Sequence, residues 1–235
     1  MPSDTVSIPQ QLDPKVFFAE LTNLDWEDIE SVHAVTSRLL TELAGRRALL
    51  LSMIDNVSQD PSLFARSESD GVLNKLVLYE NSERSFSVRL HTLVSEEYDR
   101  PHDHRATFSA LILRGSYLHT IYNIPASYAQ DDERGQPTLA AEFLKHLKPV
   151  VTRREIVGNV YTLHHSAFHS TIADQSHLSL VIRGPSVKER LLFIDERKGN
   201  TRWYYGSAFE TEQELTAVRM TVETLKTMRD KIVAL

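Results

Sequence analysis

The chain has 235 residues, of which 41% are hydrophobic and 25% charged, and its 26 Lys and Arg against 32 Asp and Glu give a net charge of -6. This composition is typical of a soluble globular protein and excludes a collagen-like or largely disordered chain. The acidic balance argues against nucleic-acid binding through a broad basic surface. Cysteine is absent, which excludes disulfides, thiolate metal sites and a cysteine nucleophile.

No targeting or membrane-spanning segment is predicted. Residues 1–11 lack the basic and apolar regions of a secretory signal. The longest apolar stretch, residues 48–54, is too short to cross a bilayer. We therefore expect a cytoplasmic protein without a membrane partner.

The segment 1–72 is predicted to be helical and to pack on the domain that follows it. Apolar residues recur at helical spacing over Ile29–Leu43, and Gly45 ends this run. Asp25 is expected to cap the helix, with an acid three positions later. A further short helix is predicted over residues 48–57.

Residues 73–208 are predicted to form a β-barrel. Strand-like segments alternate there with turn residues, for example at Arg114-Gly115-Ser116 and Gly184-Pro185. About eight short strands in about 130 residues favour a barrel or a double-sheet sandwich. The expected strands are 75–79, 85–94, 108–113, 117–123, 150–154, 159–163, 177–183 and 190–195.

Residues 209–235 are predicted to contain one C-terminal helix, over Thr211–Leu235. Its apolar residues step by three and four, as in a helix laid against the barrel. A seam for self-association, and therefore a homodimer, is the alternative. These apolar residues are Leu215, Val218, Val222, Leu225, Met228, Ile232 and Leu235.

The histidines form a spaced pattern in the strand region. His102 and His104 flank Asp103, and on an extended segment their side chains share one face and can reach one point. Three residues separate His104 from Phe108, and six residues separate Phe108 from Gly115. Further along, Gly158 and five residues precede a segment that starts at His164 and ends at His169.

These spacings resemble the two signature motifs of the cupin superfamily. His102, His104 and Gly115 match the first motif, and Gly158 and His169 match the second, while Phe108 stands where the family usually has Glu. The resemblance implies a cupin jelly roll, a double-stranded β-helix, whose metal is held by His102, His104 and His169. Three neutral ligands leave the charge of a divalent ion uncompensated and several coordination positions open. The resemblance implies Fe(II) first, with zinc, nickel or manganese as alternatives.

Among cupins, the chain looks most similar to the thiol dioxygenases of the cysteine dioxygenase type. Residues 85–93 resemble the strand before that family's H-D-H motif, which His102-Asp103-His104 matches. The family's Ser-x-His-x-Tyr reads Ser179-Leu180-Val181-Ile182-Arg183 here, without its His and Tyr. A divergent member with another substrate is therefore expected.

Three further residues are candidates for catalysis. The resemblance places His91 toward the metal cavity, although by period alone its face of the strand could meet solvent. If Ser179 faces the cavity, as its match in the related family does, period two carries Arg183 there as well. The guanidinium of Arg183 would bind a substrate carboxylate. A surface role for Arg183 is the alternative, and Arg89 or Lys75 would then be tested next.

Structural roles are predicted for most of the remaining histidines. His33, His119 and His146 are expected to be ordinary helix or strand residues. His164 and His165 lie close to His169 in sequence and are expected in turn or packing roles, with a supporting or substrate role left open.

Together these features predict a mononuclear non-haem Fe(II) oxygenase. Its substrates would be O₂ and a small polar or carboxylate-bearing molecule, with no nucleic-acid partner. A metal-dependent hydrolase, isomerase or decarboxylase that does not use O₂ is an alternative. So is a ligand-binding cupin without catalysis.

Overall fold

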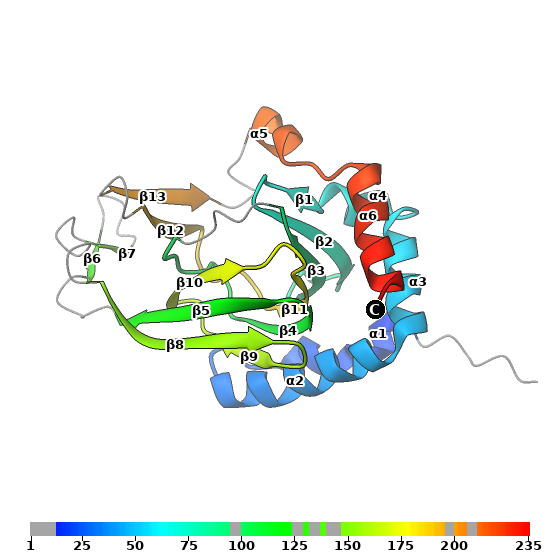
Figure 1. The fold of residues 1–235 in the computed structure, drawn as a ribbon, viewed down its shortest axis with the longest axis horizontal. Helices are drawn as coiled ribbons and strands as arrows, with labels where there is room; N and C mark the ends of the chain where they lie inside the picture. Colours follow the sequence, from blue (N-terminus) through cyan, green and yellow to red (C-terminus); the bar gives the residue numbers. More distant parts are fainter. Residues whose placement is uncertain are drawn as a thin grey trace, which may run out of the picture.

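Two antiparallel sheets face each other, and helices cover the outer face of the larger one (Figure 1). The computed structural model describes residues 13–94, 100–123, 129–131, 137–139, 147–195, 200–205 and 211–235. The helices are α1 (Pro14–Phe17), the 3₁₀ helix η1 (Ala19–Asn23), α2 (Ile29–Gly45), α3 (Arg47–Val57), α4 (Pro61–Ala65), α5 (Glu212–Ala217) and α6 (Val222–Val233). The strands are β1 (Glu68–Ser69), β2 (Leu73–Glu80), β3 (Ser87–Leu93), β4 (Phe108–Arg114), β5 (Ser116–Asn123), β6 (Ala129–Asp131), β7 (Pro137–Leu139), β8 (Lys148–Ile156), β9 (Val160–Leu163), β10 (Phe168–Ala173), β11 (Leu178–Arg183), β12 (Arg190–Asp195) and β13 (Asn200–Tyr205).

The strand order is that of a jelly roll. The larger sheet runs β1-β2-β3-β11-β4-β9, and the smaller runs β10-β5-β8. From β4 to β11 the chain passes back and forth between the two sheets, and backbone bridges from His102 to His169 and Phe193 link β10 to β12. This alternation closes the two sheets into a barrel. The predicted fold class, mainly β and of the cupin jelly-roll type with flanking helices, is confirmed.

The two faces of the larger sheet have different partners. Because side chains alternate along a strand, one set of apolar residues packs under the helices and the other points into the barrel. The outer set belongs to the main core, with Leu76, Leu78, Val88, Leu90, Leu111, Leu178, Leu180 and Ile182. The inner set forms a second core, with Phe108, Ala110, Ile112, Tyr161, Leu163 and Val181, joined by Tyr117 from β5.

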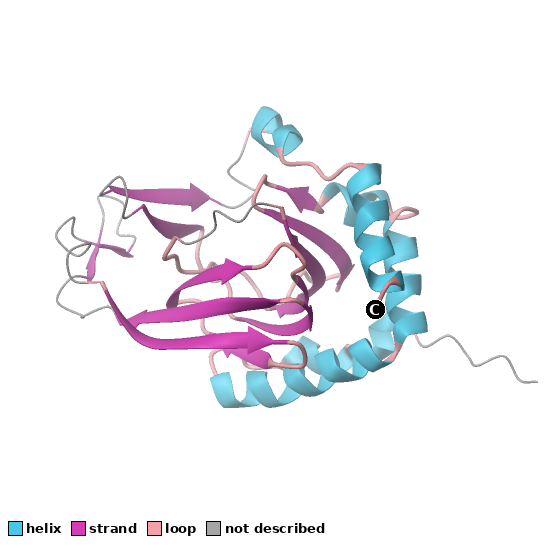
Figure 2. Ribbon diagram, viewed as in Figure 1, coloured by secondary structure: helices cyan, strands magenta, loops and turns pink. Residues whose placement is uncertain are grey.

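Helix α2 runs below the sheets in this view, α3, α4 and α6 lie to their right, and α5 lies at the top (Figure 2). Helix α2 runs along β4 and β9, where Thr36 Oγ1 donates to Ser109 Oγ at 2.6 Å. It begins three residues later than predicted, since its cap is Asp28, whose carboxylate accepts from the Ser31 backbone N–H. Asp25, the expected cap, instead accepts from the N–H of Glu27 in the preceding turn.

The C-terminal segment forms two helices where one was predicted. Between α5 and α6 the chain is extended and pairs with the β1 region, because Ser69 N–H donates to Val218 O and Met220 N–H donates to Ser67 O. Thr221 then caps α6. The apolar side of α6 packs into the main core, and Arg229 binds Asp55 of α3. No helix within the described ranges is long and apolar enough to cross a membrane.

Candidate metal centre

The H-D-H segment lies between β10 and β12, and both neighbours fix it. Its His102 exchanges backbone hydrogen bonds with His169 of β10, both at 2.9 Å. Asp103 accepts from the Leu192 N–H of β12 at 2.7 Å and from Lys188 Nζ at 2.6 Å. Because neighbouring side chains on an extended segment point to opposite sides, this anchoring of Asp103 turns His102 and His104 to the inner side.

Three imidazoles meet at that point, as the spacing predicted. His104 Nε2 lies 2.7 Å from His169 Nε2. The ring of His102 lies 4.8 Å from that of His104 and 4.6 Å from that of His169, measured between centroids. His102 Nδ1 donates to the Arg100 carbonyl at 2.8 Å, so the lone pair of the neutral ring is on Nε2. One nitrogen from each ring is therefore available to a single ion.

Burial keeps these imidazoles neutral. Desolvation lowers the pKa of His102 to about 4. Desolvation, and then the neighbouring His102, lowers the pKa values of His104 and His169 well below their usual value. Neutral imidazole is the form that binds a metal, so the donor set fits a divalent transition metal at physiological pH.

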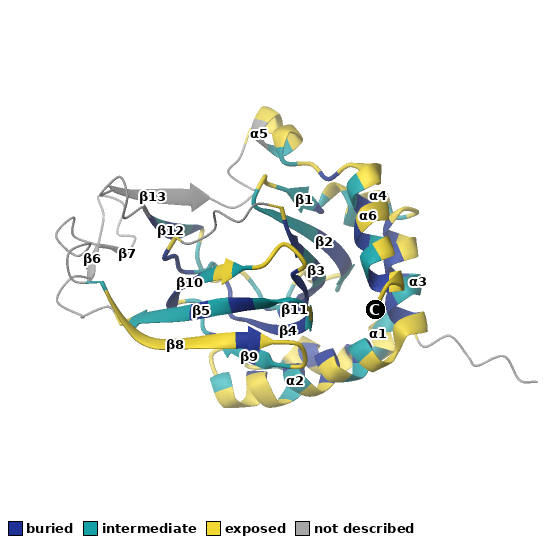
Figure 3. Cartoon of the chain, viewed as in Figure 1, coloured by how far each residue is buried: buried dark blue, intermediate teal, exposed yellow. Residues whose placement is uncertain are grey.

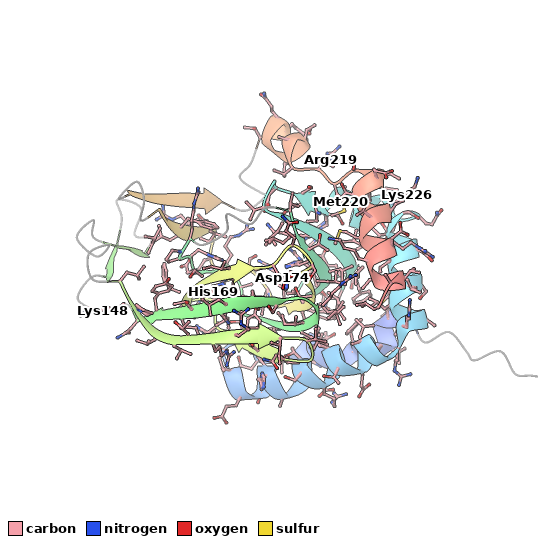
Figure 4. All side chains as sticks on the ribbon, viewed as in Figure 1. Lys148, His169, Asp174, Arg219, Met220 and Lys226 are labelled. Carbon is pink, nitrogen blue, oxygen red and sulfur yellow. The ribbon has the colours of Figure 1, made fainter. Side chains whose placement is uncertain are left out.

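A hydrogen-bonded chain behind His169 fixes its orientation. His169 Nδ1 lies 2.9 Å from His119 Nε2, and His119 Nδ1 lies 3.0 Å from Glu155 Oε1. Glu155 is the one buried residue of the otherwise exposed β8 (Figure 3). A carboxylate only accepts hydrogen bonds, so His119 Nδ1–H donates to Glu155. His119 Nε2 then accepts from His169 Nδ1–H, and His169 presents its Nε2 lone pair to the centre.

The prediction that His119 is an ordinary strand residue is therefore wrong. It belongs to the support of the centre, and Glu155 was missed altogether. Burial raises the pKa of Glu155, but hydrogen bonds from His119 and Asn159 outweigh it and keep this carboxylate ionised. His119 and Glu155 lie on the adjacent strands β5 and β8, each on the face opposite its exposed neighbours. A histidine and an acid in this arrangement are the sequence signal from which the pair could have been predicted.

Phe108 occupies the place that its motif position indicates. Its ring lies 4.6 Å from His104 and 6.3 Å from His169 between centroids, at the start of β4. It offers no ligand atom, so the centre keeps only its three imidazoles among the described residues. An apolar wall beside the ligands also excludes water from that side.

Arg183 lies across from Phe108 in the register of β11 and β4. Desolvation, and then the positive charge of Arg89, lowers the pKa of Arg183 to about 9. Arg183 donates to Gly184 O and Ser186 Oγ, and Arg89 Nε donates to Ser87 Oγ. Among the residues that the structure describes, no carboxylate binds either guanidinium.

His91 and Ser179 lie further from the imidazoles. They oppose each other on β3 and β11, and Ser179 pairs with Ile112 on the other side. Ser179 precedes Arg183 by four residues on β11, which is roughly 13 Å along the strand. Both belong to the inner face, and His91 Nε2 is buried without a hydrogen-bond partner. The structure thus brings Arg183 to the level of the three imidazoles and separates His91 and Ser179 from that level.

His177, at the same far end of the barrel, predicts acid sensitivity. Burial lowers its pKa to about 4, whereas the unfolded side chain titrates near 6.5. Its contribution is therefore fully present above pH 6.5 and is lost as the pH falls toward 4, because the unfolded chain binds the proton more tightly. We expect His177→Phe to reduce the loss of stability between pH 7.5 and 5 by about 2 kcal/mol. Thermal melts of metal-free protein at both pH values test this, and equal losses in the variant and the wild type would contradict it.

The fold and the site together define a jelly-roll protein with a buried three-histidine centre. No protein-family model and no curated protein matches the chain. Solved structures that resemble part of it include an RmlC-like cupin from Shewanella frigidimarina NCIMB 400, with 12% identity, a TM-score of 0.34, and coverage of 52% of this chain and 85% of that one. KdgF from Halomonas sp. shows 12% identity and a TM-score of 0.33, over 50% of this chain and 82% of that one. Hydroxypropylphosphonic acid epoxidase from S. wedmorenis shows 12% identity and a TM-score of 0.32, over 49% of this chain and 51% of that one. Each likeness covers about half of this chain at an identity too low to carry over an activity.

Proposed function

We propose that the protein is a mononuclear non-haem Fe(II) oxygenase acting on a small, acid-bearing substrate. The observation that carries this proposal is the convergence of three neutral imidazoles, with no carboxylate ligand among the described residues, at the same level as the half-buried guanidinium of Arg183, which no described carboxylate binds. Three neutral ligands leave both charge and coordination positions for an anionic substrate. The proposal therefore unites the metal ligands and Arg183 in one site.

Each group has a distinct task in this site. His102, His104 and His169 would hold the ion, and His119 with Glu155 would keep His169 in the required tautomer. Bound Fe(II) would supply the redox chemistry that allows O₂ to react with the substrate. Phe108 keeps water from one side of the ligands.

The substrate's acidic group is assigned to Arg183, with Arg89 beside it. Both guanidiniums are half-buried, and a substrate anion would supply the counter-charge that no described carboxylate gives them. His91 and Ser179 would contact the part of the substrate that extends along the barrel. Their roles, and the inward path of the substrate, stay predictions.

The test starts from protein purified without oxygen, stripped of metal and then loaded with Fe(II). Bound iron is measured first, and O₂ uptake is then followed while small carboxylic, phosphonic and sulfonic acids are screened. One bound iron with acid-dependent O₂ uptake supports the proposal. Protein that takes up no iron overturns it. Turnover of an acid without O₂ uptake overturns the oxygenase assignment and favours a hydrolase, isomerase or decarboxylase.

Arg183→Lys is expected to weaken binding of the acid more than it slows the reaction. Lysine keeps the charge but loses the planar fork that matches a carboxylate. We expect KM to rise about tenfold or more, with a smaller change in kcat, because one bidentate charge-assisted interaction is lost. Steady-state kinetics with the best acid from the screen measures the split. Arg114→Lys, at an exposed end of β4, is the matched control, and a wild-type KM in Arg183→Lys would place the anchor elsewhere.

A further inference from the structure

A second group of ligand-type side chains joins the N-terminal helices to the barrel. Glu27, just before α2, meets His164 and His165, which follow β9. Its Oε2 lies 2.9 Å from His164 Nε2, and its Oε1 lies 3.3 Å from His165 Nε2. One carboxylate and two imidazole nitrogens thus converge from segments far apart in the chain. None of these three residues belongs to the three-histidine centre.

The backbone around this group is anchored on both sides. Trp26, next to Glu27, is buried against Gly184 so closely that an added Cβ at Gly184 would lie 2.4 Å from the indole ring. On the barrel side, the carbonyl of His165 accepts from Lys188 Nζ at 2.9 Å. The three side chains therefore start from fixed positions, and an ion would not have to gather them from a mobile loop.

The nitrogens that face Glu27 are suited to bind a cation. His164 Nδ1 accepts from the Ser166 backbone N–H at 3.3 Å and lies 2.7 Å from Ser166 Oγ, so the neutral ring carries its proton on Nε2 and donates to Glu27. A divalent ion would replace that proton, because a metal binds the nitrogen that has lost it. Without a cation, both imidazoles must share the one carboxylate, and the contacts of His165 Nε2 with it, at 3.3 and 3.4 Å, are long for hydrogen bonds. The Glu27 side chain is 58% exposed, so water can complete the coordination shell.

We propose that Glu27, His164 and His165 form a second binding site for a divalent transition metal of the zinc, cobalt or nickel type. Two imidazoles and one carboxylate with open positions suit these ions, whereas magnesium and calcium prefer oxygen ligands. The site is independent of the proposed oxygenase activity, because it shares no ligand with the centre inside the barrel.

Equilibrium dialysis of metal-free protein against Co²⁺, followed by metal analysis, tests the proposal. Wild type is expected to bind two equivalents. Glu27→Gln and His164→Ala should each bind one, and the double variant His102→Ala/His169→Ala should also retain one. His33→Ala removes an exposed histidine of α2 outside both groups and should bind two. Thermal melts confirm that each variant is folded.

The outcomes separate the two sites. The proposal is overturned if Glu27→Gln binds as many equivalents as the wild type, or if the double variant binds none. A wild type that binds one equivalent, lost in Glu27→Gln and retained in the double variant, would support this second site and instead overturn the centre inside the barrel.

Discussion

Replacing His169 with alanine should remove bound iron and turnover together. Three imidazoles are the whole ligand set among the described residues, and Phe108 stands where a fourth ligand could have compensated. A site reduced to two neutral ligands loses most of its affinity for a divalent ion. We expect one equivalent of iron fewer than in the wild type and turnover at the background rate, measured by metal analysis and O₂ uptake on the same sample.

His33→Ala serves as the control for this experiment, because it removes a histidine from the surface. Thermal melts without metal should show both variants folded, since alanine at position 169 removes no part of the main hydrophobic core. A His169→Ala protein with full iron content and rate would show that another residue completes the centre.

His119→Phe should weaken iron binding about 10- to 100-fold, as loss of a hydrogen-bond partner behind a metal ligand commonly does. Phenylalanine fills a similar volume but cannot accept the proton of His169 Nδ1. The ring of His169 would then lose the contact that fixes its tautomer. Competition with a chelator measures the affinity, and iron content at saturation shows whether the site itself survives.

His119→Gln separates this positioning role from simple packing. The amide oxygen of glutamine can still accept from His169, so affinity should recover in large part. Glu155→Gln tests the far end of the chain, where the negative charge is lost but an acceptor for His119 remains. Equal affinities in His119→Phe and the wild type would contradict the role assigned to this pair.

Local pattern was enough to predict the main strands of the barrel. In segments such as β3 and β11, the alternation of side chains along the sequence indicates which residues share a face. The glycine at position 115 predicted the turn between β4 and β5, and the structure gives it a positive φ of 74°. The break between α5 and α6 could not be predicted in this way. The break results from pairing of residues 218–220 with β1, a contact between distant parts of the chain. The helical spacing of apolar residues continues across the break, so the sequence pattern does not reveal it.

The same distinction between local pattern and long-range contact holds for the three-histidine centre. The spacing of His102 and His104 places both side chains on one face, and the resemblance to the two cupin motifs added His169 as a third predicted ligand. His119 and Glu155 could not be predicted, since their alignment behind His169 depends on the register of β10, β5 and β8. Strand β10 itself was missed. Its residues His169, Ser170 and Thr171 are polar although the first two are buried, so they lack the apolar signal of a strand.

The position of His102 has a consequence for how the protein is made. Its backbone is bridged to His169 on one side and to Phe193 on the other, and its neighbour Asp103 is tied to Leu192. Contacts across such long stretches of chain form late in folding, because each requires a large loop to close first. During synthesis helices α1 to α4 and the first strands can associate before residues 190–195 have left the ribosome. The proposed metal centre would therefore form only after residues 190–195 are available, and a chain that stops before them would lack the backbone contacts that hold His102.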